Sequence, residues 1–238
     1  MPHTRDISPR SLRIVATHSA IAGLCPLIPL PYVDDLLIRQ VTRRMCGALF
    51  EAHGLHLTPA SARALTSAPT HWLRGAATSL ALFPARKLLR KIVYLMAIKD
   101  CSEVASSVFH DGWLLARLLE RDPQARSIED PRYLHKVRKA MLQTYADIDP
   151  APLRRALVGA FLGARVGAGH AVRAVQRLRR GDAAGPGDRV EDLIGRMRAA
   201  AMGEWRYMDA LERSFARRLG LKPTNAGLAT SGEAAPAA

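Results

Sequence analysis

The residues from 151 to 180 concentrate positive charge without a single acidic side chain. They include seven arginines, which would fall within an arc of roughly 160° if the whole stretch were one helix. These arginines are Arg154, Arg155, Arg165, Arg173, Arg177, Arg179 and Arg180. Because arginine side chains bind phosphate and carboxylate oxygens well, the pattern favours an anionic partner: a membrane surface, a nucleic acid or an acidic protein.

A second basic group lies between two apolar runs in the segment 79–98. Arg86 precedes Arg90, and Lys87 precedes Lys91, by four residues, so a helix places all four side chains on one face. Basic side chains beside apolar runs suit the headgroup region of a membrane, where long stems stay in apolar surroundings while the charges reach phosphate. An ordinary solvated helix face above buried core residues is the alternative explanation.

Three glycines follow one another at intervals of four residues in the arginine-rich stretch, at Gly159, Gly163 and Gly167. A repeat of small residues every four positions lets two helix backbones approach closely, which membrane helices favour in particular. We therefore predict that these glycines pack against a neighbouring helix, either in a membrane or in a soluble bundle.

The histidines offer weaker candidates for chemistry. His53 and His56 form an HxxH pair, but Gly54 between them indicates a helix end, and a metal site would need further ligands in a rigid frame. His110 and Asp111 are adjacent in a predicted helix, so they cannot share a face, and a structural role is expected. We predict no metal site and no cofactor.

Familiar enzyme signatures are missing from the chain. The sequence has no phosphate-binding GxxxxGK[ST], no GxGxxG after a strand, no HExxH and no GxSxG. The formal net charge of +14 indicates attraction to polyanions. Nucleic acid is a weaker candidate than lipid, because aromatic residues make up only 5% of the chain and apolar residues interrupt the arginines.

Prolines interrupt the most apolar segment of the chain, Ile14–Tyr32, so it does not read as a conventional spanning helix. We predict that the bend containing Pro29, Pro31 and Asp34 joins two antiparallel helices, and an acid at the start of the second complements the helix dipole. The three cysteines lack any CxxC pattern, which indicates reduced and buried thiols.

Helix start and stop signals dominate the sequence, and no convincing alternating strand pattern is present. We predict an all-α bundle of amphipathic helical hairpins, with a hairpin domain over 1–180, a long C-terminal amphipathic helix over 188–220 and a disordered tail over 221–238. The expected helices lie near 9–29, 31–53, 59–67, 70–83, 85–121, 131–146, 151–180 and 188–219, with a bend in the fifth near residues 111–112.

The segment 20–54 resembles a bacterial group of helical domains of unknown function, the YcjF-type membrane proteins and, more distantly, the EcsC-type proteins. The residues that match the characteristic bend of this group are Ile28, Pro29, Pro31 and Asp34. The similarity extends over about residues 20–120, although here His53 and Gly54 replace an aromatic residue and glycine. It implies a helical, membrane-linked bacterial protein, sometimes associated with GTPases or transporters, and supplies no catalytic residues.

From these observations we expect a non-catalytic anchor or scaffold that binds anionic lipid on the cytoplasmic side of a membrane, peripherally or by shallow insertion. The alternative is a soluble basic helical protein that binds nucleic acid or an acidic protein partner. A helical enzyme with a buried His/Asp site ranks third. The sequence does not indicate an oligomeric state.

Overall fold

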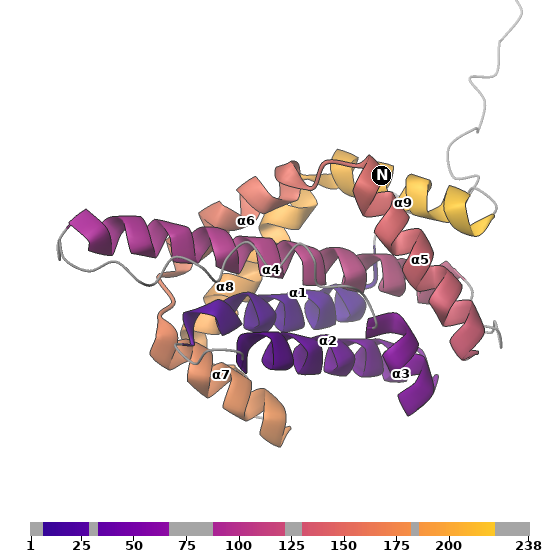
Figure 1. The fold of residues 1–238 in the computed structure, drawn as a ribbon, viewed down its shortest axis with the longest axis horizontal. Coiled ribbons are helices and arrows are strands. Elements are labelled where there is room, and N and C mark those ends of the chain that lie inside the picture. Colours follow the sequence, from indigo (N-terminus) through magenta and orange to yellow (C-terminus); the bar gives the residue numbers. More distant parts are fainter. Residues whose placement is uncertain (1–6, 29–32, 67–87, 122–129, 182–185, 222–238) are drawn as a thin grey trace, which may run out of the picture.

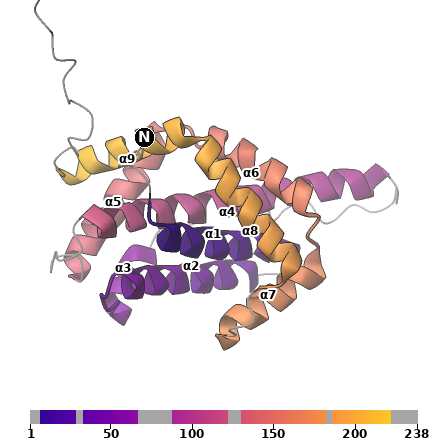
Figure 2. The ribbon, with the colours of Figure 1, turned by 180° about the vertical axis from the view of Figure 1, so that it is seen from behind.

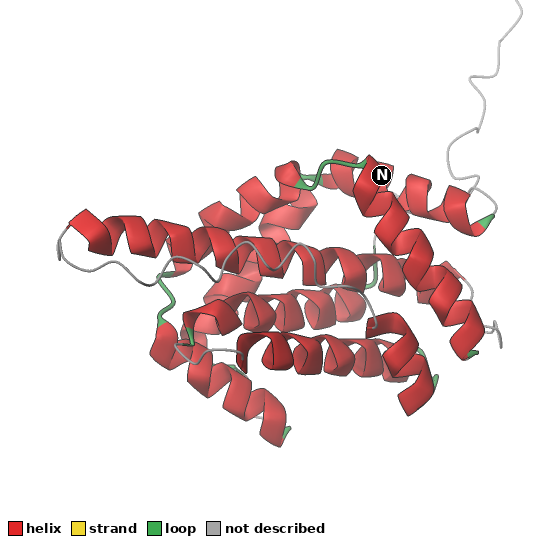
Figure 3. Cartoon of the chain, viewed as in Figure 1, coloured by secondary structure: helices red, strands yellow, loops and turns green. Residues whose placement is uncertain are grey.

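The computed structural model describes residues 7–28, 33–66, 88–121, 130–181 and 186–221. Within these ranges all regular structure is helical and no strand occurs (Figure 3), which confirms the all-α prediction. The elements are α1 (Pro9–Leu24), the 3₁₀ turn η1 (Cys25–Leu27), α2 (Val33–Ala52), α3 (Pro59–Thr66), α4 (Leu88–Arg121), α5 (Pro131–Asp147), α6 (Ala151–Ala164), α7 (Ala168–Arg180), α8 (Asp188–Gly203) and α9 (Trp205–Leu219).

Polar side chains directly before proline start three of these helices, as the sequence predicts. Ser8 Oγ accepts a hydrogen bond from the amide of Ser11 at 3.1 Å, and Thr58 Oγ1 accepts one from the amide of Ser61 at 3.1 Å. Asp130 Oδ1 accepts at 2.9 Å from the amide two residues further on. These bonds satisfy amides that have no partner within the helix, so local sequence fixes where α1, α3 and α5 begin.

The long helix α4 runs through the middle of the molecule, and α1 packs along it more extensively than any other pair of described helices does (Figure 1). On its other sides α1 contacts α2 and α8, and α8 crosses behind the pair, as the reverse view shows (Figure 2). The helix α6 covers α4 and α8, while α5 packs between α3 and α9. This arrangement makes α1 the most enclosed helix of the bundle.

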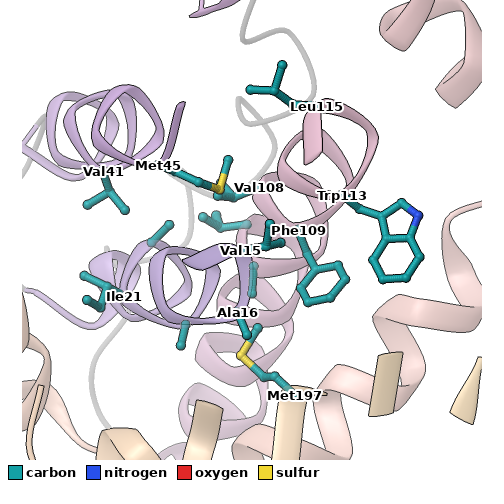
Figure 4. Close-up of a cluster of buried hydrophobic side chains, with 14 of the residues drawn as sticks. Val15, Ala16, Ile21, Val41, Met45, Val108, Phe109, Trp113, Leu115 and Met197 are labelled. Carbon is teal, nitrogen blue, oxygen red and sulfur yellow. The ribbon is translucent and has the colours of Figure 1, made fainter. Parts of the chain in front are cut away.

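The core is built from the inner face of α1 and the helices around it. Figure 4 shows Val15 of α1 beside Met45 of α2 and Val108 of α4, while Ala16 turns toward Met197 of α8. Val15, Ala16 and Met45 have no exposed surface. Residues from four helices thus share one apolar cluster, so the described part of the chain folds around a common core.

Close packing occurs at two glycines that the sequence analysis did not single out. A Cβ atom on Gly23 of α1 would lie 2.7 Å from Ala105 Cβ and 2.8 Å from the carbonyl oxygen of Cys101. A Cβ atom on Gly112 of α4 would lie 2.7 Å from Met45 Sδ. These glycines allow α1, α2 and α4 to pack closely.

The prediction for the glycines of the arginine-rich stretch is wrong for Gly159 and Gly167. Gly159 and Gly167 are exposed, and a Cβ atom on either would meet nothing within 4 Å. Gly163 is also exposed, and its nearest neighbour would be the flexible guanidinium end of Arg196 at 2.6 Å. Within the described part of the chain Gly159 and Gly167 therefore meet no neighbouring helix, and Gly163 meets only the end of one side chain of α8 at the closest distances.

Replacement of Gly23 by alanine is expected to lower the free energy of unfolding by about 1–3 kcal/mol, because the added methyl group has no space between α1 and α4. Urea denaturation measures the change. Gly159→Ala is the matched control, since it adds the same group to a helix where space is open, and it should stabilise the protein by about 0.5–1 kcal/mol. Equal effects of the two substitutions would contradict this account of helix packing.

The expected helix over 151–180 is two helices, α6 and α7, separated by a turn. Arg165 adopts a left-handed conformation with φ of 50° and ends α6, and Gly167 then starts α7 from an extended conformation. Between them, Val166 is 4% exposed and joins the core. The prediction failed because burial of Val166 and docking of α7 on α1 outweigh the helical propensity of the stretch.

The expected helix over 188–219 is also divided, at Glu204, into α8 and α9. The apolar stripe of α8 packs on α1 and α6, whereas Met208, Leu211 and Phe215 of α9 are buried where that helix packs mainly on α5. A straight continuation of α8 would not bring both stripes to these surfaces. Trp205, the first residue of α9, is 49% exposed at the junction.

Two further boundaries differ from expectation. The helix α1 ends at Leu24, five residues before the predicted end at residue 29, and the turn η1 follows. The helix α4 continues through Gly112, near which the sequence predicts a bend, as one uninterrupted helix. The interruption between α1 and α2, which pack together, agrees with the predicted hairpin. The expected helix over 70–83 and all but the first residue of the predicted tail lie outside the described residues.

Candidate anion-binding surface and groove

The break between α6 and α7 divides the predicted arginine face, so its seven members do not form one arc. On α6, Arg154 pairs with Glu103 of α4 at 3.3 Å, while Arg155 is exposed. Arg165 is exposed at the turn. Neither Arg155 nor Arg165 has an ion pair among the described residues. The positive charge of α6 and of the turn that follows it is therefore largely uncompensated.

The helix α7 presents a basic face with no acidic residue on the whole helix. Arg173 and Arg180 are exposed, and their spacing of seven residues places them on one side. Neither forms an ion pair within the described residues. Arg177 lies on the same side but is half-buried, whereas Arg179 is exposed on another side. Buried Ala171, with other small residues, attaches the opposite side to the bundle.

The other predicted lipid-binding and bend residues are only partly described. The residues outside the described ranges are Arg86, Lys87, Pro29 and Pro31. The structure describes the backbone, but not the side chains, of Arg90 and Lys91 in α4 and of Asp34 in α2.

A single arginine of α2 attaches the C-terminal end of α7. Arg44 Nη1 donates a hydrogen bond to the carbonyl oxygen of Leu178, and Nη2 donates to that of Arg179 at 3.0 Å. The last carbonyl groups of a helix lack partners within it and carry partial negative charge, so a guanidinium group stabilises this end. Three of the five guanidinium N–H groups of Arg44 remain outside these two bonds.

An open groove lies where α1, α2 and α7 meet, with a volume of about 410 Å³. Its polar side chains come from Arg44 and Glu51 of α2, Arg177 of α7 and His18 of α1. The remaining lining residues are small or apolar: Gly47, Ala48, Leu178 and Gly181. The volume falls in the range of small-molecule sites.

The hydrogen bond of His18 determines which of its ring nitrogens can accept. Nδ1 lies 2.8 Å from the carbonyl oxygen of Ile14, and since a carbonyl only accepts, Nδ1 carries the proton. Burial lowers the pKa of His18, the bond to Ile14 partly offsets this, and the charge of Arg44 lowers the pKa further. In the neutral ring Nε2 is therefore an acceptor, and it has no hydrogen-bond partner among the described residues.

A separate polar centre joins α4 to α5 and α9. His110 Nε2 lies 2.9 Å from Tyr207 Oη, and Asp111 accepts hydrogen bonds from Arg138 at 2.7 Å and from Tyr145 at 2.8 Å. His110 and Asp111 thus face different partners, as their adjacency predicts. Burial lowers the pKa of His110 to about 3, so the ring is neutral. This centre connects helices, which is the expected structural role.

A second polar centre, absent from the sequence analysis, surrounds Glu212 of α9. Its carboxylate accepts from Arg117 Nε at 2.7 Å and from Arg121 Nη2 at 2.6 Å, both on α4. Arg117 also pairs with Glu120, which accepts from the amide of Ser8. A signal was available, because Glu212 occurs among the buried apolar positions of α9, where an unpaired acid would be costly.

The histidine pair and the cysteines are the remaining candidates for metal or thiol chemistry. His53 Nε2 lies 3.3 Å from Ser11 Oγ, and among the described residues no three His, Cys, Asp or Glu side chains are grouped to hold a metal ion. The three cysteines are buried and none of them forms a disulfide, as predicted. Burial raises the pKa of Cys46 and of Cys101 to about 12, which keeps both thiols protonated.

No helix in the described ranges is both long and apolar enough to cross a membrane. Comparison of the chain with protein-family models, curated proteins and solved structures finds no match. The resemblance to YcjF-type and EcsC-type proteins accordingly stays a prediction.

Proposed function

We propose that this protein is a non-catalytic, membrane-associated helical protein that binds an anionic lipid surface through the basic face of α7 and the neighbouring Arg165 of the α6–α7 turn. It would act as an anchor or scaffold on the cytoplasmic side of a membrane. The observation that carries the proposal is the largely uncompensated charge of residues 151–180, where exposed arginines occur in thirty residues without an acid.

The energetics of surface binding support this proposal. Each basic side chain near an anionic membrane contributes about 1 kcal/mol, so a few exposed arginines suffice for reversible attachment. Leu162 of α6 is 40% exposed in the same stretch. An apolar side chain among arginines suits the boundary between headgroups and acyl chains, whereas a surface that binds only phosphate groups would not need it.

Removal of two charges from α7 tests the proposal. The double variant Arg173→Gln/Arg180→Gln should bind vesicles of phosphatidylglycerol and phosphatidylcholine about 30-fold more weakly, from the loss of about 2 kcal/mol. Vesicle sedimentation measures binding, and circular dichroism checks the helix content. The matched control is Arg132→Gln/Lys139→Gln on α5, which removes two exposed charges at the same spacing of seven residues.

Equal loss of binding in both double variants would contradict a role for α7, because net charge alone would explain it. A parallel titration with duplex DNA and RNA tests the alternative function. Tight, salt-dependent nucleic-acid binding without vesicle binding would replace the proposal with a soluble nucleic-acid-binding protein. Binding to neither would contradict both and favour an acidic protein partner.

A further inference from the structure

The groove between α1, α2 and α7 owes its space to two small residues of α2. Gly47 and Ala48 lie on the same side of α2 as Arg44 and Glu51, at spacings of three, four and seven residues. A Cβ atom on Gly47 would meet nothing within 4 Å, so the hollow is open at this point. A larger residue here would be accommodated by the fold and would fill the groove.

The polar groups of the groove differ in character along α2. Arg44, with N–H groups outside its two bonds to α7, and Arg177 supply hydrogen-bond donors and positive charge. Glu51, two helical turns after Arg44, supplies an exposed carboxylate. His18 adds a second acceptor, the Nε2 atom of its neutral ring. The groove therefore offers both an anion-binding part and an acceptor part.

This combination restricts the ligand. A simple anion such as inorganic phosphate would be attracted by the arginines but repelled by the carboxylate of Glu51. A ligand that carries an anionic group together with a cationic donor satisfies both parts. A phosphate ester of ethanolamine has these groups, since its phosphate accepts from guanidinium and its ammonium donates three N–H groups.

We propose that the groove lined by His18, Arg44, Glu51 and Arg177 binds the phosphoethanolamine group. The inference rests on the proposed membrane association, because the groove adjoins the C-terminal end of α7, whose basic face would lie on the lipid. The arginine surface then supplies general attraction to anionic lipid, and the groove supplies recognition of one headgroup. The same chemistry is present in phosphatidylethanolamine and in the free phosphoethanolamine ester.

Calorimetric titration with short-chain lipids below their micellar concentration tests the recognition. Dihexanoyl phosphatidylethanolamine should bind at least about tenfold more tightly than dihexanoyl phosphatidylcholine, because the trimethylammonium group cannot donate hydrogen bonds to Glu51 or His18. Titration with phosphoethanolamine alone distinguishes the two sources. Equal affinity of the free ester and the lipid would assign the soluble ester as ligand, and weaker binding of the ester would assign the lipid.

Two variants locate the binding in the groove. Gly47→Leu should reduce binding of dihexanoyl phosphatidylethanolamine by more than about tenfold, whereas Gly159→Leu, at another helical glycine with open space, should leave it unchanged. Glu51→Gln should remove the preference for ethanolamine over choline while phosphate binding persists. Unchanged binding in Gly47→Leu, or a preserved preference in Glu51→Gln, would overturn the proposal.

The same measurements separate this proposal from the proposed function. Arg173→Gln/Arg180→Gln should lose binding to anionic vesicles but retain binding of the short-chain lipid, because neither residue lines the groove. Equal affinities of the wild-type protein for the two short-chain lipids would overturn the groove proposal and leave vesicle attachment standing. Absent vesicle binding with preserved headgroup preference would overturn the attachment instead.

Discussion

Replacement of Glu212 by alanine is expected to lower the free energy of unfolding by about 3–5 kcal/mol. The carboxylate lies between Arg117 and Arg121, and the three side chains are 11%, 13% and 20% exposed. Removal of the acid leaves two guanidinium groups close together, mostly out of water and without their shared partner. This like-charge repulsion and lost hydrogen bonding make the expected cost larger than that of an ordinary ion pair.

Asp209→Ala is the matched control on the same helix. Asp209 pairs with Arg213 at 3.1 Å, but Arg213 is 69% exposed, so its loss should cost less than about 1 kcal/mol. Urea denaturation at neutral pH compares the two variants. If Glu212→Ala costs no more than Asp209→Ala, water replaces the missing carboxylate, and the centre around Glu212 contributes little to the attachment of α9.

Acidification from pH 7 to pH 4 is expected to remove about 3 kcal/mol of stability through His110 alone. In the folded protein the pKa of His110 is about 3, whereas the unfolded side chain has the ordinary value of 6.5. At pH values between about 3 and 6.5, His110 binds a proton in the unfolded state but not in the folded state. The contribution is therefore complete above pH 6.5 and is lost as the pH falls toward 3. The lowered pKa of His18 acts in the same direction.

The variant His110→Leu/Tyr207→Phe isolates this contribution. It removes both partners of the 2.9 Å contact, so neither is left as an unpaired polar group in the core. Urea denaturation between pH 7 and pH 4 should show a slope smaller by about 1 kcal/mol per pH unit than that of the wild-type protein. Carboxylates and His18 contribute to both slopes and cancel in the comparison. Identical slopes would show that His110 takes up a proton in the folded state.

The beginnings of the helices were predictable because their causes are local. Ser8, Thr58 and Asp130 each cap the residues that directly follow them, so the signal and its structural effect occupy one short segment. The ends within 151–180 and 188–219 were not predictable in this way. Arg165 and Glu204 are not strong helix breakers, and the chain turns there because residues beyond the turn are buried against other helices.

The candidate site shows the same division. The excess of positive charge in 151–180 was evident from the sequence, because the residue composition of a segment does not depend on folding. The glycine prediction failed for Gly159 and Gly167, since close packing depends on which helices meet, and the tightest contacts occur at Gly23 and Gly112. The groove was not predictable either, because its lining comes from α1, α2 and α7 and its space depends on Gly47.

The position of Arg44 joins two parts of the molecule in one thermodynamic cycle. Its guanidinium group holds the last carbonyls of α7 and lines the groove on α2. A ligand that strengthens this orientation of Arg44 also favours the docked position of α7, and docking of α7 improves the affinity for the ligand by the same factor. The basic helix that we propose to face the lipid and the groove beside it are therefore coupled reciprocally through a single side chain.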